Sequence, residues 1–513
     1  MDCFEMVAAA LERSGCSTVF GVPGGGPNLD LIGALERHGV RFVLAHTESG
    51  AAMMASACGL VSGVPSAVIV TRGPGAASVV NGTAQATLDR SPLVVITDSV
   101  PMSSRDRTAH QRFDQREVMR PVALRTARVG NDVTVDELDG LIAVASGPRP
   151  GAIHIDLDAS APTDIDPDRE EHSEVRYSTQ AVVSELIRRS RTPVVIAGMH
   201  APDGIAECLE EFGAPVLATY QAVGVLPEGH HLNAGLFTNS TPERELLESA
   251  DLVILIGFDE VEPLPGSWPA ACDVVAIDAV PTTHRFAPVT AHYLGHPEQV
   301  LEVSARSHDV GSGHVQRLRA RLADAARPLG PVATVRAAAE MWPESGVLTV
   351  DAGAHFLAVL PFWPVTRRRQ LLISNGLSTM GYALPAAIGA AIADPERPVM
   401  ACTGDGGLHM VLAELETLSR LQLPVCVTVF NDSALTLIRL KQREGQGGGT
   451  AVQYGVTDFA AVARAMGMSA TVVDDSRQLH DAFLDAYRHG GPYLVDVRLD
   501  PSEYEHIIRV SRG

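Results

Sequence analysis

Residues 399–407 read Val-Met-Ala-Cys-Thr-Gly-Asp-Gly-Gly, and residues 425–432 read Val-Cys-Val-Thr-Val-Phe-Asn-Asp. Each stretch begins as an apolar run that is typical of a buried strand and ends in polar residues. Neighbouring parallel strands would bring Asp405 and Asn431 together at the carboxyl edge of a sheet, where open α/β sheets bind ligands. Carboxylate and amide oxygens suit Mg²⁺, which usually shares its coordination shell with phosphates and water.

The glycines in the first stretch extend this prediction. Gly406 and Gly407 allow a phosphate to approach the backbone, and a helix expected to open at Leu408 would direct its amide groups toward the anion. The pattern therefore predicts a magnesium and phosphate site. The alternative is a pair of ordinary βα turns in which Asp405 only caps a helix.

Similar alternation of apolar runs and helical patterns continues through the whole chain. Strands that alternate with helices indicate parallel sheets covered on both faces. We expect an α/β fold of three consecutive doubly wound parallel-sheet domains, at residues 1–165, 178–308 and 330–513. The charged segment 162–176 is expected to be a linker, and residues 305–330 a helix with a second connection. The expected strands of the first two domains are 18–20, 42–45, 67–71, 93–97, 152–157, 193–197, 216–219, 252–256 and 274–277.

The composition excludes several classes of protein. The chain has 513 residues with 40 basic and 61 acidic side chains, a formal charge of −21. This charge disfavours nucleic acids and anionic membranes as partners. Lys441 is the only lysine, so no Gly-Lys phosphate loop exists and Schiff-base chemistry would depend on that residue alone. The uncharged stretches 51–71 and 371–393 are broken by glycine or proline and are expected to form buried core rather than membrane spans.

The cysteines and the N-terminus indicate where the chain works. Seven scattered cysteines form no C-x-x-C pair. This pattern fits neither a disulfide framework nor a zinc site. The acidic start Met1-Asp2-Cys3-Phe4-Glu5 does not fit a signal peptide. We expect a cytoplasmic protein.

Five motifs in order resemble the thiamine-diphosphate-dependent enzymes, in their acetohydroxyacid-synthase-like branch, over nearly the whole chain. The resemblance implies a pyrimidine-binding domain, a central domain and a diphosphate-binding domain. The motifs are Val22-Pro23-Gly24-Gly25, Thr47-Glu48-Ser49-Gly50-Ala51, Thr71-Arg72-Gly73-Pro74-Gly75-Ala76, Asn375-Gly376-Leu377-Ser378-Thr379-Met380-Gly381 with Leu384-Pro385-Ala386-Ala387, and Gly404-Asp405-Gly406 followed by Asn431.

The resemblance assigns catalytic roles to three residues. Glu48 would hydrogen-bond the aminopyrimidine of thiamine diphosphate and favour the tautomer that acts as a base, and its apolar surroundings are expected to raise its proton affinity. The alternative is a surface glutamate at a helix start. Met380 would hold the cofactor bent, a role that is also a packing role. Gln111 aligns with an active-site glutamine.

Further residues would hold the cofactor and its metal. The Mg²⁺ ligands implied are Asp405, Asn431 and the carbonyl of Ser433. The carbonyl of Ser378 would accept from the cofactor's amino group. In relatives the pyrimidine and diphosphate ends are held by different subunits, so a homodimer or homotetramer is implied. The other cofactor-binding residues implied are Pro23, Gly24, Gly353, Ala354, His355, Gly406 and Gly407, with His355 alternatively a helix cap.

Several positions depart from the family pattern and bear on the substrate. Arg72 replaces a small residue, and Lys441 falls where relatives carry a pocket tryptophan; together they predict a cationic pocket mouth for an anionic substrate. His110 is a candidate acid or a solvated histidine. The segment 257–260 lacks an arginine-bearing pattern, so FAD is not expected. Gly25 and Leu437 complete the expected substrate pocket.

The reaction implied is decarboxylation of a 2-oxo acid, with pyruvate as donor, followed by transfer of the acyl unit to a carbonyl acceptor, as in acetolactate synthesis. Simple decarboxylation of an aryl or branched oxo acid is the close alternative, and cleavage of a 2-hydroxyacyl-CoA ranks behind it. A nicotinamide dehydrogenase is disfavoured because Pro23 breaks the early glycine-rich pattern. A non-catalytic family member is disfavoured because Glu48, Asp405 and Asn431 are all present.

Overall fold

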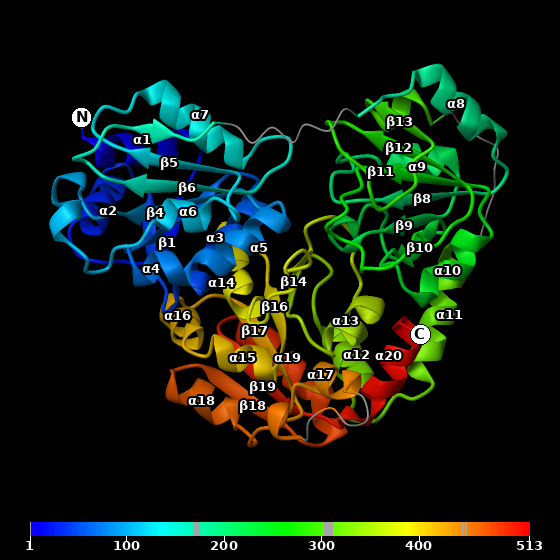
Figure 1. Cartoon of the computed structure of the whole chain (residues 1–513). Helices are drawn as coiled ribbons and strands as arrows, with labels where there is room; N and C mark the ends of the chain where they lie inside the picture. The colour runs from blue at the N-terminus through cyan, green and yellow to red at the C-terminus, as the bar shows by residue number, and fades with distance from the viewer. Residues whose placement is uncertain (1, 168–174, 302–310, 443–445, 447–448, 513) are drawn as a thin grey trace.

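Three α/β units, each built around its own sheet, make up the chain (Figure 1). The computed structural model describes residues 2–167, 175–301, 311–442, 446 and 449–512. The predicted fold class is confirmed, because the three sheets are parallel apart from one edge strand. Three predicted features lie outside the described residues: the domain limit at residue 308, the start of the expected 305–330 segment and the centre of the expected linker.

The first unit has a seven-stranded sheet in the order β2-β1-β3-β4-β6-β5-β7. Its five predicted strands are present, and β5 and β7 are additional. Arg125 and Arg128 interrupt the apolar run of β5 and hide it from the sequence, and β7 lies in the expected linker, where it pairs antiparallel with β5. The strands are β1 (Thr18–Val22), β2 (Arg41–Leu44), β3 (Ser66–Val70), β4 (Leu93–Asp98), β5 (Arg125–Val129), β6 (Ala152–Leu157) and β7 (Asp164–Ile165), and the helices are α1 (Cys3–Arg13), α2 (Pro27–Arg37), α3 (Glu48–Ser62), α4 (Pro74–Ser78), α5 (Val80–Leu88), α6 (Gln115–Met119) and α7 (Val135–Ala145).

The central unit has a six-stranded parallel sheet in the order β10-β9-β8-β11-β12-β13. Its four predicted strands are present, and β10 and β13 extend the two edges. The strands are β8 (Pro193–Ala197), β9 (Val216–Ala218), β10 (Asn233–Leu236), β11 (Leu252–Ile256), β12 (Asp273–Asp278) and β13 (Ala291–Leu294), and the helices are α8 (Gln180–Arg189), α9 (Ala206–Phe212) and α10 (Thr241–Glu248).

The third unit has a six-stranded parallel sheet in the order β15-β14-β16-β17-β19-β18. The apolar run before Asp405 and the run that ends at Asn431 form β16 and β17, at the centre of this sheet. The strands are β14 (Val347–Val350), β15 (Leu371–Ile373), β16 (Val399–Gly404), β17 (Val425–Asn431), β18 (Ser469–Val473) and β19 (Tyr493–Arg498), and the helices after the central sheet are α11 (Gly311–Ala323), α12 (Pro331–Met341), α13 (Phe356–Phe362), α14 (Ala383–Ala393), α15 (Asp405–Met410), α16 (Glu414–Leu421), α17 (Thr436–Lys441), α18 (Phe459–Ala465), α19 (Leu479–His489) and α20 (Tyr504–Arg512).

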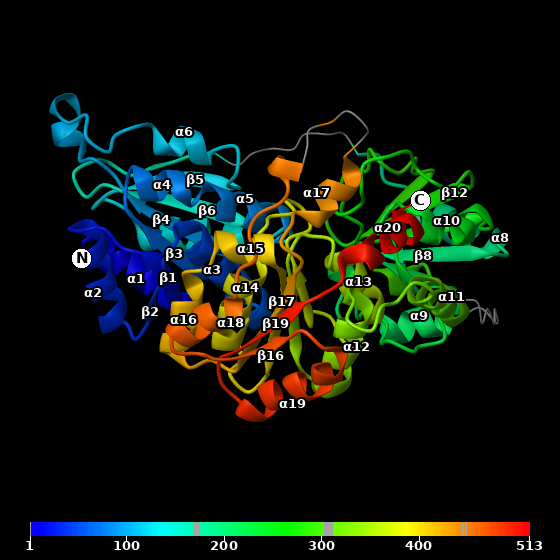
Figure 2. The same cartoon turned by 90° about the horizontal axis from the view of Figure 1, so that it is seen from below.

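Helices α3 and α14 lie against each other and join the first and third units (Figure 2). Both are rich in alanine and glycine and buried along most of their length. A Cβ on Gly389 would lie 2.0 Å from the Met54 carbonyl oxygen, so glycine permits this close approach. These helices come from the two uncharged stretches, which are buried core as predicted. Among the described residues no helix is long and apolar enough to cross a membrane.

Candidate functional site

Asp405 and Asn431 follow neighbouring strands of the third sheet. Gly404 of β16 is paired with Phe430 of β17, so the two residues lie at adjacent strand ends, as predicted. Both are buried, at 3% and 4% exposure. The side-chain amide nitrogen of Asn431, Nδ2, donates to the Asp496 carboxylate at 2.8 Å and to the Thr457 carbonyl at 3.0 Å. In the described part of the chain its Oδ1 accepts no hydrogen bond, which leaves this oxygen free for a ligand.

The Asp405 carboxylate is held by three donors. Its oxygens accept from the Ser433 amide at 2.5 Å, the Gly406 amide at 2.7 Å and the Tyr454 hydroxyl at 2.8 Å. Burial raises the pKa of Asp405, and burial together with the charge of Asp405 raises the pKa of Asp432 to about 6. Asp405 is buried and Asp432 half-buried, and a cation bound beside them would offset their repulsion.

Gly406 lies at the bottom of a narrow cradle. A Cβ there would lie 2.7 Å from Leu435, 3.0 Å from the Tyr454 hydroxyl and 3.5 Å from Cε of Met380. Met380 is therefore beside the turn, where its predicted packing role would place it. The helix that follows begins at Asp405 and not at Leu408, so that prediction was wrong by three residues. Strand β16 runs directly into the helix, so Gly406 and Gly407 lie in the first turn of α15.

Ser433 and Tyr454 lie together across the turn. Ser433 has a left-handed backbone with φ 57°, and its carbonyl accepts from the Tyr454 amide at 3.3 Å. The predicted ligand atom of Ser433 thus has a protein partner, although a carbonyl oxygen keeps a second lone pair. Tyr454 was missed by the sequence reasoning. No local motif marks it, because it reaches Asp405 from 49 residues further along the chain.

Asp351 fixes the loop that carries Met380. It is 1% exposed and accepts from the Gly381 amide at 2.9 Å, the Tyr382 amide at 3.0 Å and the Thr403 hydroxyl at 2.9 Å. Burial raises its pKa to about 6. One carboxylate therefore ties the Met380 loop to the end of β16, and it too was not singled out from the sequence.

His355 lies under the Gly404 turn. It stacks on Phe430 with ring centroids 5.2 Å apart, and burial lowers its pKa to about 4. It occupies the position before α13, yet its side chain makes no capping hydrogen bond. Its Nε2 is buried without a partner, which is a sign of a ligand that the polypeptide does not supply. Gly353 and Ala354 precede it on the loop after β14, as predicted.

A second group of predicted residues gathers at the carboxyl edge of the first sheet. A Cβ on Gly24 would lie 2.3 Å from the Thr71 hydroxyl, and one on Gly73 would lie 2.8 Å from Cβ of Gln111. The turn containing Pro23, the turn after β3 and Gln111 are thus in contact. Gln111 is exposed and has a left-handed backbone with φ 54°.

Glu48 is the first residue of α3, at the end of β2 on the same edge. It is half-buried. The residues before it are bound by the third unit of the same chain, since buried Glu414 accepts from the Thr47 amide at 2.9 Å and the His46 amide at 3.2 Å. Its own chain therefore brings α16 to Glu48. No hydrogen bond or ion pair within the described ranges links Glu48 to Asp405.

The expected substrate-pocket residues are less tightly grouped. Arg72 is turned inward: its guanidinium donates to the Ser99 carbonyl at 2.9 Å and pairs with Asp98 at 3.3 Å. Its guanidinium is therefore engaged within the first unit, and the cationic pocket mouth stays a prediction. Lys441 is exposed at the end of α17, and Leu437 is half-buried on the same helix. Gly25 and His110 are exposed on the first unit.

Salt bridges of one buried acid, Asp259, attach the central unit to the first unit. Asp259 lies in the 257–260 segment, where FAD was not expected. It pairs with Arg90 at 2.9 Å and with Arg149 at 3.5 Å, and it accepts from His200 at 3.1 Å. These charges hold the pKa of Asp259 well below its usual range, against the effect of burial. The turns after β8 and β11 are in backbone contact, because a Cβ on Gly198 would lie 2.4 Å from the Gly257 carbonyl. Two arginines of the first unit therefore engage the edge of the central sheet at Asp259.

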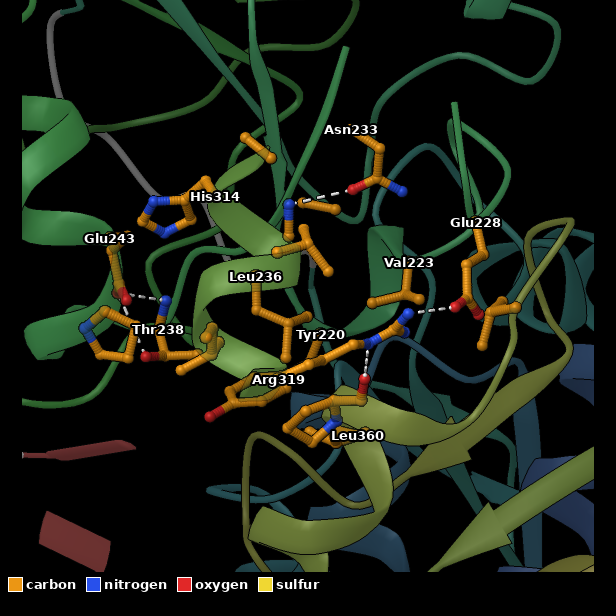
Figure 3. Close-up of a pocket in the computed structure, with 18 of the residues that line it drawn as sticks. Tyr220, Val223, Glu228, Asn233, Leu236, Thr238, Glu243, His314, Arg319 and Leu360 are labelled. Carbon is orange, nitrogen blue, oxygen red and sulfur yellow. Dashed lines mark hydrogen bonds and ion pairs between the residues drawn. The ribbon is translucent and has the colours of Figure 1, made fainter. Parts of the chain in front are cut away.

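A separate cavity of about 310 Å³ lies between the central and third units (Figure 3). Its walls are mainly apolar, and Arg319 crosses it to pair with Glu228 at 2.5 Å. On the opposite wall, the backbone amide of Thr238 donates to the Glu243 carboxylate at 2.7 Å. None of the predicted site residues lines it.

Comparison with known proteins agrees with this geometry. The N-terminal TPP binding domain of thiamine pyrophosphate enzymes matches residues 1–118, the central domain matches 181–303, and the C-terminal TPP binding domain matches 351–497. An acetolactate synthase of Bacillus subtilis (strain 168) is 28% identical over 541 residues, covering 97% of this chain and 93% of the relative.

Two further relatives extend the similarity. The acetolactate synthase isozyme 1 large subunit of Escherichia coli (strain K12) is 28% identical, over 97% of this chain and 94% of its own. A probable 2-ketoarginine decarboxylase of Pseudomonas aeruginosa is 30% identical over 533 residues, covering 96% of this chain and 93% of the relative. The chain therefore belongs to the thiamine pyrophosphate enzyme family, as an acetolactate synthase-like member.

Proposed function

We propose that the chain is a Mg²⁺- and thiamine-diphosphate-dependent carboligase that decarboxylates a 2-oxo acid, with pyruvate as donor, and transfers the acyl unit to a carbonyl acceptor. The observation that carries the proposal is the cradle around Gly406. Asp405, Asn431 and Met380 surround a turn in which a Cβ would already be crowded. Such a turn admits a diphosphate close to the backbone and a metal on the two oxygen ligands.

Each half of the proposed site has its own task. Asp405 and Asn431 would hold Mg²⁺, His355 and Gly404–Gly407 would face the diphosphate, and Glu48 would donate a proton to the aminopyrimidine. When bound, the cofactor supplies an electron sink that stabilises the acyl anion equivalent. Gln111, beside Gly73, would orient the reacting carbonyl.

We propose a homodimer or homotetramer with the site shared between subunits. The absence of described contacts between Glu48 and Asp405 within one chain supports this arrangement. Exposed apolar side chains at both half-sites support it as well, since large apolar side chains at a surface mark an interface. On the third unit these are Leu377 (38%), Met410 (58%) and Val456 (71%), and on the first unit Leu29 (56%) and Leu44 (44%).

A second candidate is a simple 2-oxo acid decarboxylase. Its support is the 30% identity to a probable 2-ketoarginine decarboxylase over 96% of this chain. The engagement of the edge of the central sheet by two arginines supports activity without FAD in either case.

Proton NMR of the chain with Mg²⁺, thiamine diphosphate and pyruvate distinguishes these candidates. We expect acetolactate, unaffected by added FAD. Acetaldehyde as the sole product would instead establish the decarboxylase. No turnover, with cofactor binding shown by a thermal shift, would exclude pyruvate, and 2-ketoarginine would then be tested as the donor. The Asp405→Ala variant is the matched control, because it should remove both the shift and the products.

A further inference from the structure

Three side chains of the central unit converge far from the proposed active site. Asp278 is the last residue of β12, His292 lies on β13, and His284 lies on the connection between the two strands. Oδ2 of Asp278 lies 2.7 Å from Nε2 of His284 and 2.8 Å from Nε2 of His292. Three potential ligand atoms therefore meet around a single point.

The strand register explains this convergence. His292 is paired with Ala276 in the parallel ladder between β13 and β12. Paired residues point to the same face of a sheet, and so do residues two apart on one strand. Asp278 and His292 therefore share a face by construction, and the connection brings His284 onto them.

Burial makes the charge of this cluster costly. The side chains of Asp278, His284 and His292 are 3%, 2% and 7% exposed. Among the residues that the structure describes, no arginine or lysine pairs with Asp278. Asp259 at the same sheet edge, by contrast, has two arginines. A buried carboxylate without a cation is normally paired or bound to a metal.

In the described ranges, no other group of histidine, cysteine and acidic side chains brings three potential ligand atoms together in this way. His38 contacts Glu12 through Nδ1 at 2.7 Å and Glu5 through Nε2 at 3.3 Å, so its two carboxylates lie on opposite sides of the ring. In the cluster both imidazoles present Nε2 to the same carboxylate oxygen. Nδ1 of His284 is buried without a partner, and Nε2 is the ring nitrogen that faces Asp278.

We propose that Asp278, His284 and His292 form a site for a divalent transition-metal ion of the Zn²⁺ class. Two imidazole nitrogens and one carboxylate oxygen suit Zn²⁺, with water in the fourth position. Bonds of about 2.0 to 2.2 Å in a tetrahedral arrangement need ligand atoms about 3.3 Å apart. The present separations of 2.7 and 2.8 Å would have to open by roughly half an ångström. The ion would fasten the 279–290 connection to both strands and stabilise the central unit.

Metal binding by the full-length protein, with Mg²⁺ in large excess, tests the proposal. Chelator-treated protein is titrated with Zn²⁺, and bound zinc and the thermal midpoint are measured for unaltered protein and for His284→Gln and His292→Gln. Glutamine keeps a donor for Asp278 but is a poor zinc ligand. The matched control is His231→Gln, which alters the stacked His230–His231 pair, where the ring centroids are 4.6 Å apart.

We expect the unaltered protein to bind one Zn²⁺ per chain, with a rise in its thermal midpoint. Either cluster variant should bind Zn²⁺ at least about tenfold more weakly, as loss of a metal-site group does. The His231→Gln variant should behave as the unaltered protein. Equal zinc content and equal midpoint gain in unaltered protein and His284→Gln would overturn the proposal and leave a hydrogen-bonded cluster only. Co²⁺ titration of the unaltered protein is an independent readout, because a four-coordinate site gives strong visible absorption, and only the weak absorption of hydrated Co²⁺ would also refute it.

Discussion

Replacing Glu414 by alanine should loosen the start of α3 and displace Glu48. Glu414 is fully buried at the junction of the first and third units. It accepts from the His46 and Thr47 amides and from the hydroxyls of Thr47 and Thr417, at 2.8 to 3.2 Å. The two residues before Glu48 are therefore positioned by a helix of the third unit.

The magnitude follows from the groups left without a partner. Alanine leaves two partly buried amides without their partner, and an orphaned donor costs about 1–3 kcal/mol when fully buried, so Glu414→Ala should lower the free energy of unfolding by about 2 kcal/mol and by no more than about 6 kcal/mol. Glutamine keeps one oxygen for the Thr47 amide and hydroxyl, and the Thr417 hydroxyl can turn to accept from the new amide group. Glu414→Gln should therefore cost only about 1 kcal/mol.

Denaturant unfolding measures these differences, and hydrogen exchange at the His46 and Thr47 amides localises them. Glu416→Ala is the matched control on the same helix. Its side chain is 41% exposed and pairs with His46 at 2.7 Å, a surface pair worth about 0–1 kcal/mol. If Glu414→Ala cost no more than Glu416→Ala, or left the exchange of both amides unchanged, the reasoning would be refuted.

Three further predictions concern the proposed site and its surroundings. Glu48→Gln should leave thiamine diphosphate binding intact by calorimetry yet slow turnover about 10²–10⁴-fold, as loss of a positioned acid–base group does; full activity would exclude Glu48 from proton transfer. Burial raises the pKa of Asp89 to about 6 from 3.8, so its contribution to stability is greatest below pH ~4 and is lost as the pH rises through 6. A pKa shift of about 2 units corresponds to about 3 kcal/mol. The free energy of unfolding of Asp89→Asn, relative to that of the unaltered protein, should therefore rise by up to this amount between pH 4 and 7. Parallel curves of stability against pH for the two proteins would contradict it. Lys441→Met should raise KM for an anionic oxo acid with little change in kcat if the exposed ammonium attracts substrate; an unchanged KM at low ionic strength would remove Lys441 from the pocket.

The sequence alone determined the parallel α/β class, most strands of the first two units and the sheet edge that carries Asp405 and Asn431. Apolar runs such as 152–157, 193–197 and 252–256 coincide with β6, β8 and β11 residue for residue. Burial on both faces of a parallel sheet needs continuous apolar side chains, so the signal is local and readable. The polar residues that end such runs, Asp405 and Asn431, are brought together by the parallel pairing itself.

Contacts between distant segments were decided by the tertiary structure. Tyr454 reaches Asp405, Glu414 binds the residues before Glu48, and Asp98 pairs with Arg72, and none of these pairs is marked by spacing in the sequence. Strand β5 was likewise decided by the tertiary structure, because its pairing with β6 and β7, and not an apolar run of its own, holds it in the sheet. Local pattern specifies which residues are buried, whereas the partner of a buried polar group depends on which elements pack together and is therefore decided only in the folded chain.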